Sequence, residues 1–256
     1  EKSKNWWRMS ADWGSSWIHI QVNGLNQYGQ PFISSGLHMG DMGGGARATK
    51  DGIDCGGIPC ATTSTANIET LERKFPVLFL RRGLRTDSAG DGKYRGGLCA
   101  EIVLKPYKVN DMDALVAYTN KDIQPKGIAG GLPGAKAQII LKKQSNVRKL
   151  LQKRVPSFEE IEGDTRLFAQ VNAPFKISED DVLYSCPHSG GGFGDPLDRE
   201  PTLVYKDVIE GLISLEKARE VYKIVISLES MELDLKATEK LHRKARHKRP
   251  DKPLEE

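Results

Sequence analysis

Apolar residues alternate with polar ones, or run together, in seven short segments of the first 186 residues. Val, Ile, Phe and Tyr supply most of the apolar positions, as is typical of strands that are half buried on a sheet. Together these segments predict a sheet or a β-sandwich. The predicted strands are residues 17–22, 75–82, 100–107, 113–119, 137–143, 165–171 and 181–186.

The pattern changes after residue 200, where the apolar positions follow a helical spacing. Val204, Val208 and Leu212 are four residues apart, and Pro201 stands where a helix can begin without losing a hydrogen bond. Ser214 is a suitable N-cap for a second helix. A third, basic helix is expected to close the chain.

These elements predict an α+β fold, with a β-rich core, long glycine loops and a C-terminal group of short helices. Residues 1–200 are expected to form the glycine-loop-rich β domain, and residues 201–256 a helical segment with a basic tail. No apolar run approaches the roughly 20 residues that cross a bilayer. The chain begins with neither Met nor an apolar signal segment, so we expect a cytoplasmic protein, and a fragment or a processed piece.

Glycine is concentrated rather than spread along the chain. Of 26 glycines, 21 fall in four clusters, within residues 36–57, 83–97, 127–134 and 190–194. Because glycine lacks a Cβ, such clusters serve either tight turns or the close approach of backbone to a ligand or a partner chain. Four clusters at strand ends leave both interpretations open.

The net charge of +4 is located almost entirely in the C-terminal tail. Residues 236–252 carry a net charge of +6, which leaves −2 for the rest of the chain. A basic helix end can bind phosphate backbones, but no nucleic-acid module accompanies this one. We therefore expect a solvated helix or a contact with an acidic neighbouring subunit, and neither a nucleic acid nor a membrane as partner.

The sequence contains few candidate metal ligands. Cys55 and Cys60 have a zinc-like spacing but lack a second pair, so reduced thiols are the better interpretation. In "LHMGD", His38 and Asp41 are spaced so that both could face one ion. His188 and the later Asp195 could do the same, although a histidine among glycines is more often a hydrogen-bonded loop residue.

The stretch "SGGGFGDPLDREP" (189–201) resembles a phosphate loop only in its glycines. A Walker-type loop needs Lys followed by Ser or Thr, and here Asp195 and Pro196 follow the glycines instead. A carboxylate at this position would repel a phosphate, and the proline removes an N–H donor. The sequence therefore predicts no nucleotide site in this loop.

Seven motifs follow one another along the chain: "GDMGGGARATKDGID" (40–54), "TSTANIETLE" (63–72), "FPVLFLRRGLRTDSAGDGKYRGGLCAE" (75–101), "GIAGGLPG" (127–134), "SGGGFGDPLDREP" (189–201), "DVIEGLISLEKAREVY" (207–222) and "LDLKATEKLHRKAR" (233–246). They occur in the order found in the hydantoinase B family, which the chain resembles over nearly its whole length. This family includes the catalytic subunits or domains of N-methylhydantoinases and 5-oxoprolinases, and the α-type subunits of acetone and acetophenone carboxylases.

The resemblance implies an ATP-driven division of labour. A partner subunit of the hydantoinase A type binds ATP and phosphorylates a carbonyl, lactam or enolate oxygen of the substrate. The B-type subunit then passes the activated intermediate to water or to CO₂ derived from bicarbonate. Family members usually carry a further N-terminal half with metal-ligand-like His and Asp residues, so the divalent metal is expected outside this segment. Either the chain is a piece of a longer subunit, or another chain supplies the missing half.

Residue roles within the segment are hypotheses. Arg95 is a candidate to bind a carboxylate or phosphate, with Asp87, Ser88, Gly96 and Gly97 shaping its loop; the alternative is that Arg95 holds its own turn through Asp87 or Asp91. Residues of the last glycine loop are candidates to surround the reaction space, the alternative being a tight connection between strand and helix. That loop contributes Gly190, Gly191, Gly192 and Gly194, with Asp195 and His188 as catalytic candidates.

Three functions fit the resemblance. The favoured one is a subunit of an ATP-dependent ketone carboxylase, inactive when isolated, because a separate chain with a docking tail suits a multi-subunit complex. The second is a subunit of an ATP-dependent cyclic amide hydrolase of the hydantoinase or oxoprolinase type. The third is a non-catalytic structural paralogue in such a complex.

Overall fold

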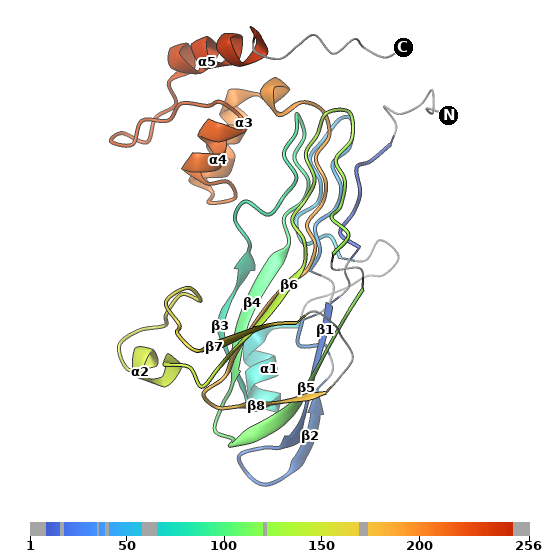
Figure 1. The fold of residues 1–256 in the computed structure, drawn as a ribbon, viewed down its shortest axis with the longest axis vertical. Helices are drawn as coiled ribbons and strands as arrows, with labels where there is room; N and C mark the ends of the chain where they lie inside the picture. The colour runs from blue at the N-terminus through green and yellow to red at the C-terminus, as the bar shows by residue number, and fades with distance from the viewer. Residues whose placement is uncertain are drawn as a thin grey trace.

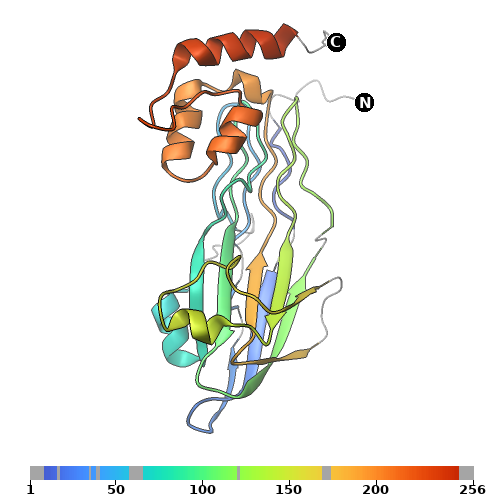
Figure 2. The ribbon, with the colours of Figure 1, turned by 60° about the vertical axis from the view of Figure 1, so that its left-hand side comes forward.

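The computed structural model describes residues 9–15, 18–34, 36–38, 41–57, 66–119, 122–168 and 174–247. The molecule is elongated. A β-sandwich lies at one end, a bundle of extended segments runs through the middle, and a group of helices lies at the other end (Figures 1 and 2). No helix within these ranges is long and apolar enough to cross a membrane.

Two antiparallel sheets form the sandwich, which confirms the predicted α+β class. The smaller sheet contains, in spatial order, β2 (Pro31–Ser34), β1 (Ile18–Leu25), β5 (Asp111–Tyr118) and β8 (Phe175–Ser178). The larger sheet contains β3 (Val77–Leu84), β4 (Ala100–Pro106), β9 (Val182–Cys186), β6 (Gln138–Lys143) and β7 (Asp164–Leu167).

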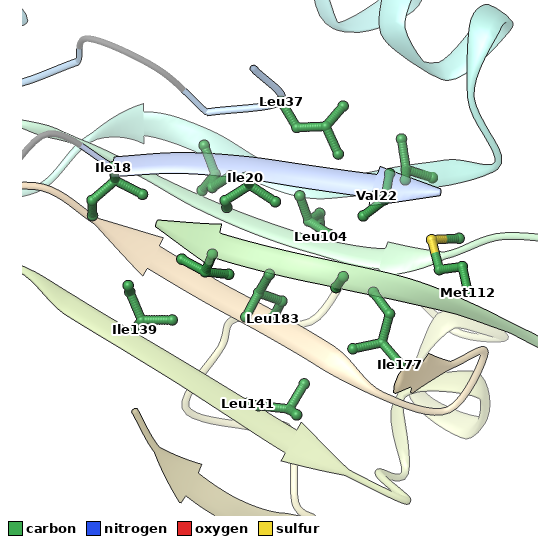
Figure 3. Packing of buried hydrophobic residues seen from close by; sticks show 14 of the residues in the cluster. Ile18, Ile20, Val22, Leu37, Leu104, Met112, Ile139, Leu141, Ile177 and Leu183 are labelled. Atoms are coloured by element: carbon green, nitrogen blue, oxygen red, sulfur yellow. The ribbon is translucent and has the colours of Figure 1, made fainter. Parts of the chain in front are cut away.

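The core of the sandwich follows from strand alternation. Every second residue of β1 is buried, beginning with Ile18 and Ile20, and Ile20 lies opposite Val116 of β5. Leu104 and Leu183 meet them from the larger sheet (Figure 3). Each such aliphatic side chain contributes about 1.5–3 kcal/mol by leaving water, so the alternating pattern fixes which face of each strand turns inward.

Six of the predicted strands are present with ends shifted by at most about three residues, and the seventh is shorter than expected. In the predicted strand 165–171, β7 ends at Leu167, and residues 169–171 lie outside the described part. The short strands β2 and β8 were not predicted, nor were the helices α1 (Ile68–Lys74) and α2 (Val147–Leu151). Each of these helices buries a single residue, too few to produce a helical pattern.

Between the sandwich and the helices, extended segments lie side by side around residues 188–194 (Figure 1). Three consecutive N–H groups of this central segment, from Gly190, Gly191 and Gly192, donate to three different segments. Their carbonyl oxygens accept from three more. The donors reach the carbonyls of Gly97, Asp12 and Leu132, and the acceptors receive the N–H groups of Gly90, Ala46 and Ile128.

This arrangement is a bundle and not a sheet. In a β-strand the hydrogen bonds alternate between two neighbours, whereas three residues pointing to six neighbours require a threefold chain of the polyproline II kind. Such a chain has no internal hydrogen bonds, so all of its backbone polar groups bond to surrounding segments. The six neighbours are residues 11–14, 43–46, 88–92, 96–98, 126–128 and 131–135, the last two being separated by a turn at Ala129 and Gly130. We call these six segments, the adjoining residues 52–54 and the central residues 188–194 the glycine bundle.

The segments of the glycine bundle are too close together for side chains between them. A Cβ on Gly190 would lie 1.9 Å from the carbonyl oxygen of Gly44, and one on Gly96 would lie 2.0 Å from that of Gly190. A Cβ on Gly43 would lie 1.9 Å from the carbonyl oxygen of Gly97. These glycines therefore serve close approach, and the surface that they approach is the chain itself.

The helices follow the bundle as predicted. A short 3₁₀ turn (Pro196–Asp198) leads into α3 (Pro201–Ile209), which begins with its proline, and then α4 (Leu215–Glu220) and α5 (Leu235–His247). The Ser214 side chain accepts from the N–H of Lys217 and caps α4. Val204, Ile213 and Tyr222 form a separate small core. The division of the chain into two domains at residue 200 stays a prediction.

We expect Gly190→Ala to destabilise the fold, because the new Cβ overlaps the Gly44 carbonyl and the bundle cannot open locally. The expected loss is about 3 kcal/mol or more, the upper range for overpacking. Gly83→Ala on β3 is the matched control, since its Cβ meets nothing within 4 Å. Thermal and urea unfolding measure both; equal melting temperatures for the two variants would contradict the bundle packing.

Candidate functional site

The predicted site residues lie in three separate places. Arg95, Asp87 and Asp195 lie where the glycine bundle meets the helices. His188 lies at the sandwich end of the central segment, which follows β9. His38 and Asp41 lie against β9 through Ser185.

Two arginines and three aspartates form a network between the bundle and α3. Arg199, which is 3% exposed, donates to both oxygens of Asp51 at 2.7 and 2.8 Å and to Asp207 of α3 at 2.8 Å. Arg95 donates to both oxygens of Asp54 at 2.8 and 3.1 Å, and to Asp207 at 3.4 Å. Bidentate arginine–carboxylate pairs of this kind fix position as well as charge. Arg95 therefore binds the carboxylates of Asp54 and Asp207, and not those of Asp87 or Asp91 that the alternative named. Binding of a ligand's carboxylate or phosphate by Arg95 stays a prediction.

Asp87 and Asp91 also bind the helical group. Asp87 has a φ of 62°, and its carboxylate accepts from the N–H of Ser214 at 2.8 Å. Asp91 accepts from the Tyr222 hydroxyl at 3.0 Å and lies 3.1 Å from the ammonium of Lys217. Burial raises the pKa of Asp91, and Lys217 opposes that shift. Charged groups on both sides of the junction thus hold the helices in place.

The last glycine loop uses its backbone internally. The N–H groups of Gly190, Gly191 and Gly192 all donate within the bundle, and Gly194 turns the chain with a φ of 76°. The Asp195 carboxylate accepts from the N–H of Leu197 at 2.9 Å and caps the turn that follows. This geometry matches the predicted strand-to-helix connection; a catalytic role for Asp195 stays a prediction.

His188 is fully buried, with Nδ1 3.4 Å from the Ser15 hydroxyl. Asp195 follows His188 by seven positions along a largely extended chain, which at about 3.1 Å per residue is a distance on the order of 20 Å. The two side chains therefore cannot share one ion. Ser88 is buried too, and its carbonyl accepts from the Ser189 hydroxyl, so these groups join neighbouring segments. Catalysis by His188 or Arg95 stays a prediction.

His38 and Asp41 are close together, with Nε2 and Oδ2 3.4 Å apart. His38 Nδ1 is 3.1 Å from the Ser185 hydroxyl, and Arg82 lies 3.5 Å from the Asp41 carboxylate. Burial lowers the pKa of His38 to about 4, although Asp41 opposes the shift. Within the described residues, no three or more His, Cys, Asp or Glu side chains form a group that could hold a metal ion. Metal binding by His38 and Asp41 stays a prediction.

Among the described residues, Cys55, Cys99 and Cys186 are free thiols, which is the interpretation that the sequence favoured. Cys60 is outside the described residues. Cys99 and Cys186, distant in sequence, hydrogen-bond to each other, and Arg85 donates to the Cys186 sulfur at 3.1 Å. The Cys99 bond and the Arg85 charge lower the pKa of the Cys186 thiol despite its burial. Sequence spacing gave no signal for this cluster.

The described architecture and motifs coincide with a known family model. The Hydantoinase B/oxoprolinase model matches residues 6–196, from before the first bundle segment to the cap of the glycine loop. The chain belongs to the Hydantoinase B/oxoprolinase family.

Individual relatives extend the match into the helices. The chain is 30% identical to the acetophenone carboxylase delta subunit of Aromatoleum aromaticum over 94% of its length, and 31% identical to the caprolactamase beta subunit of Pseudomonas jessenii over 86%. It superposes on a solved acetone carboxylase with a TM-score of 0.76 at 24% identity, which shows the shared fold. The superposition covers 93% of this chain and 34% of that one.

The chain spans about a third of the length of these relatives: 37% of the acetophenone carboxylase delta chain and 36% of the caprolactamase beta chain. This agrees with the expectation that the segment corresponds to one portion of a longer family subunit.

Replacing Arg199 with Met should destabilise the protein by about 3–5 kcal/mol, because it leaves buried Asp207 without its closest cation. Arg154→Met is the control: Arg154 pairs with Glu160 at the surface, where water replaces the lost partner, and we expect little change. Urea unfolding measures both. If the urea midpoints of the two variants were similar, the network would contribute no more to stability than a surface ion pair does.

The depressed pKa of His38 predicts a stability that depends on pH. Above its ordinary pKa of 6.5 neither state holds the proton, so stability is complete. As pH falls from 6.5 towards 4, only the unfolded chain takes up the proton, and the free energy of unfolding falls by roughly 3 kcal/mol. His38→Gln removes this titration. Measured by urea unfolding, the difference in free energy of unfolding between wild type and variant should shrink between pH 6.5 and pH 4. Parallel plots of this free energy against pH would contradict the prediction.

Proposed function

We propose that this chain is the C-terminal portion of the B-type subunit of an ATP-dependent ketone carboxylase. The observation that carries the proposal is the match to the acetophenone carboxylase delta subunit, which runs through sandwich, bundle and helices over 94% of the chain. The acetone carboxylase alpha subunit of Xanthobacter autotrophicus, 26% identical over 83% of the chain, supports it.

In the proposed reaction a hydantoinase A type partner binds ATP and transfers its terminal phosphoryl group to the enolate oxygen of the ketone, releasing ADP. Dehydration of protonated bicarbonate supplies CO₂ and water. The α-carbon of the enol phosphate forms a bond with CO₂ while water takes up the phosphoryl group as phosphate, so that the enol oxygen becomes the ketone carbonyl. The divalent metal and the missing N-terminal half of the subunit are supplied from outside this segment.

In this proposal the chain holds other parts of the enzyme in position and does not itself form a complete reaction centre. The glycine bundle joins sandwich and helices through backbone hydrogen bonds, and the arginine–aspartate network fixes α3 against its end. Surfaces that other chains add to either end would thereby be held at a constant spacing. Preorganisation of this kind matters because small misplacements of reacting groups lower rates strongly. The same geometry fits the third possibility, a structural paralogue.

A cyclic amide hydrolase is the second candidate. It is favoured by the match to the caprolactamase beta subunit and by 28% identity to the B-type chain of a putative D-/L-hydantoinase from a Pseudomonas species. In that reaction the phosphorylated lactam oxygen would make the ring carbon electrophilic towards water. Both reactions share the ATP step and differ in the acceptor.

The two reactions are separated by an assay on the complex assembled with this chain. We expect ADP formation that depends on ketone together with bicarbonate, and labelled bicarbonate entering an acid-stable product. A lactam or hydantoin should not stimulate it. The chain alone, and the complex lacking the chain, are controls that we expect to be inactive.

Each contrary outcome points elsewhere. ADP formation driven by a lactam without bicarbonate would establish the hydrolase in place of the carboxylase. Full carboxylation by the complex lacking this chain would leave only the structural role.

A further inference from the structure

A groove of about 760 Å³ lies between α4 and α5, on the end of the molecule away from the sandwich. Its floor is apolar, formed by Leu215, Ile224, Ile226 and Leu241, and Leu228 stands at its edge with 78% of its surface exposed. Exposing such a leucine to water beside an apolar groove costs free energy. Exposed apolar surfaces of this kind are typical of sites that another molecule covers.

The two walls of the groove differ in charge. The α4 wall presents Glu216 and Glu220 around Arg219. On α5, Lys244 follows Leu241 by three residues and therefore borders it on the helix surface. Leu241 is the α5 residue that lines the groove, and Lys240, Arg243 and Lys244 are exposed on the side of α5 next to it. The border of the groove along α5 is therefore cationic.

The α5 cations are not needed to hold the helix in place. The helix is anchored by its opposite side, where the Thr238 hydroxyl accepts from the N–H of Val225 at 3.0 Å and His242 Nε2–H donates to the carbonyl oxygen of Tyr222 at 2.9 Å. Arg246 adds a bond to Asp198 at 2.8 Å. The cationic wall is thus a feature of the surface and is free to serve a partner.

We propose that this groove binds an amphipathic helix of another subunit, with its apolar side against Leu228 and Leu241 and an acidic flank against α5. Helices commonly dock this way, by laying apolar side chains into a groove between two helices. The charge difference between the walls sets the orientation, because acidic residues are attracted to α5 and repelled by α4. The groove would bind such a helix whichever of the two reactions the complex catalyses.

The probe is an 18-residue synthetic helix with leucines at positions i, i+3, i+4 and i+7, glutamates along one flank and glutamines elsewhere. The comparison peptide carries lysines in place of the glutamates. Fluorescence anisotropy with the 256-residue chain measures binding at 20 and 300 mM salt. We expect the acidic peptide to bind more tightly than the basic one by about tenfold or more, and to weaken with salt, since the Debye length falls below roughly 10 Å above 0.1 M.

Two variants locate the site. Leu228→Asp should weaken binding of the acidic peptide by about tenfold at 300 mM salt, where the added charge is largely screened and the lost apolar contact remains, and by more at 20 mM salt. The triple variant Lys240→Glu, Arg243→Glu, Lys244→Glu should weaken binding of the acidic peptide mainly at low salt, where charges are least screened. Lys74→Glu, Lys149→Glu, Lys153→Glu makes the same change of charge on exposed lysines of α1 and the α2 region and should have no effect. Thermal melts confirm that all variants fold; Arg246 is kept because it holds α5.

Other occupants give other results. Equal binding of both peptides, or no binding of the acidic one at 100 μM, would overturn the proposal. Binding to phosphatidylserine vesicles in its place would assign the surface to a membrane. Self-association in sedimentation that Leu228→Asp abolishes would assign the groove to a second copy of the chain.

Discussion

The close packing of backbone against backbone around residues 188–194 is the constraint on which the rest of the molecule depends. Six neighbouring segments share hydrogen bonds with one central chain, and the distances between them exclude a Cβ at Gly190, Gly96 and Gly43. The sandwich gains its stability from buried aliphatic side chains, whereas the bundle gains it from satisfied backbone groups. The two ends of the molecule are therefore joined by a part that has almost no side-chain core of its own.

Where the bundle ends, side chains take over. Arg199 and Arg95 donate hydrogen bonds to the carboxylates of Asp51, Asp54 and Asp207. Burying such charges costs free energy unless every partner is present. We therefore expect the network to form completely or not at all. Arg95, which the motifs marked as a candidate for chemistry, is thus found binding carboxylates of its own chain.

Much of the fold could be predicted from the sequence, because the forces involved are local. Alternation placed Ile18, Ile20 and the strands around them, and Ser214 was identified as a cap by its position before an apolar run. The short strands β2 and β8 were not predicted because four residues are too few to show an alternating pattern. The bundle could not be derived, since a glycine shows that something must come close but not which segment does. Arg95 likewise gave no sign of its partner Asp207, which lies 112 residues further along the chain.

The position of the central segment has a consequence for how the protein folds. Residues 188–194 are the last of the bundle segments in the chain, and yet they occupy its middle, with partners as early as Asp12. Almost every contact of the bundle therefore joins residues that are far apart in sequence, the arrangement that makes folding slow because long loops must close before any contact is gained. Until residue 194 is in place, the outer segments have no common neighbour to bind. We therefore expect the bundle to form late and cooperatively, once its central segment is in place.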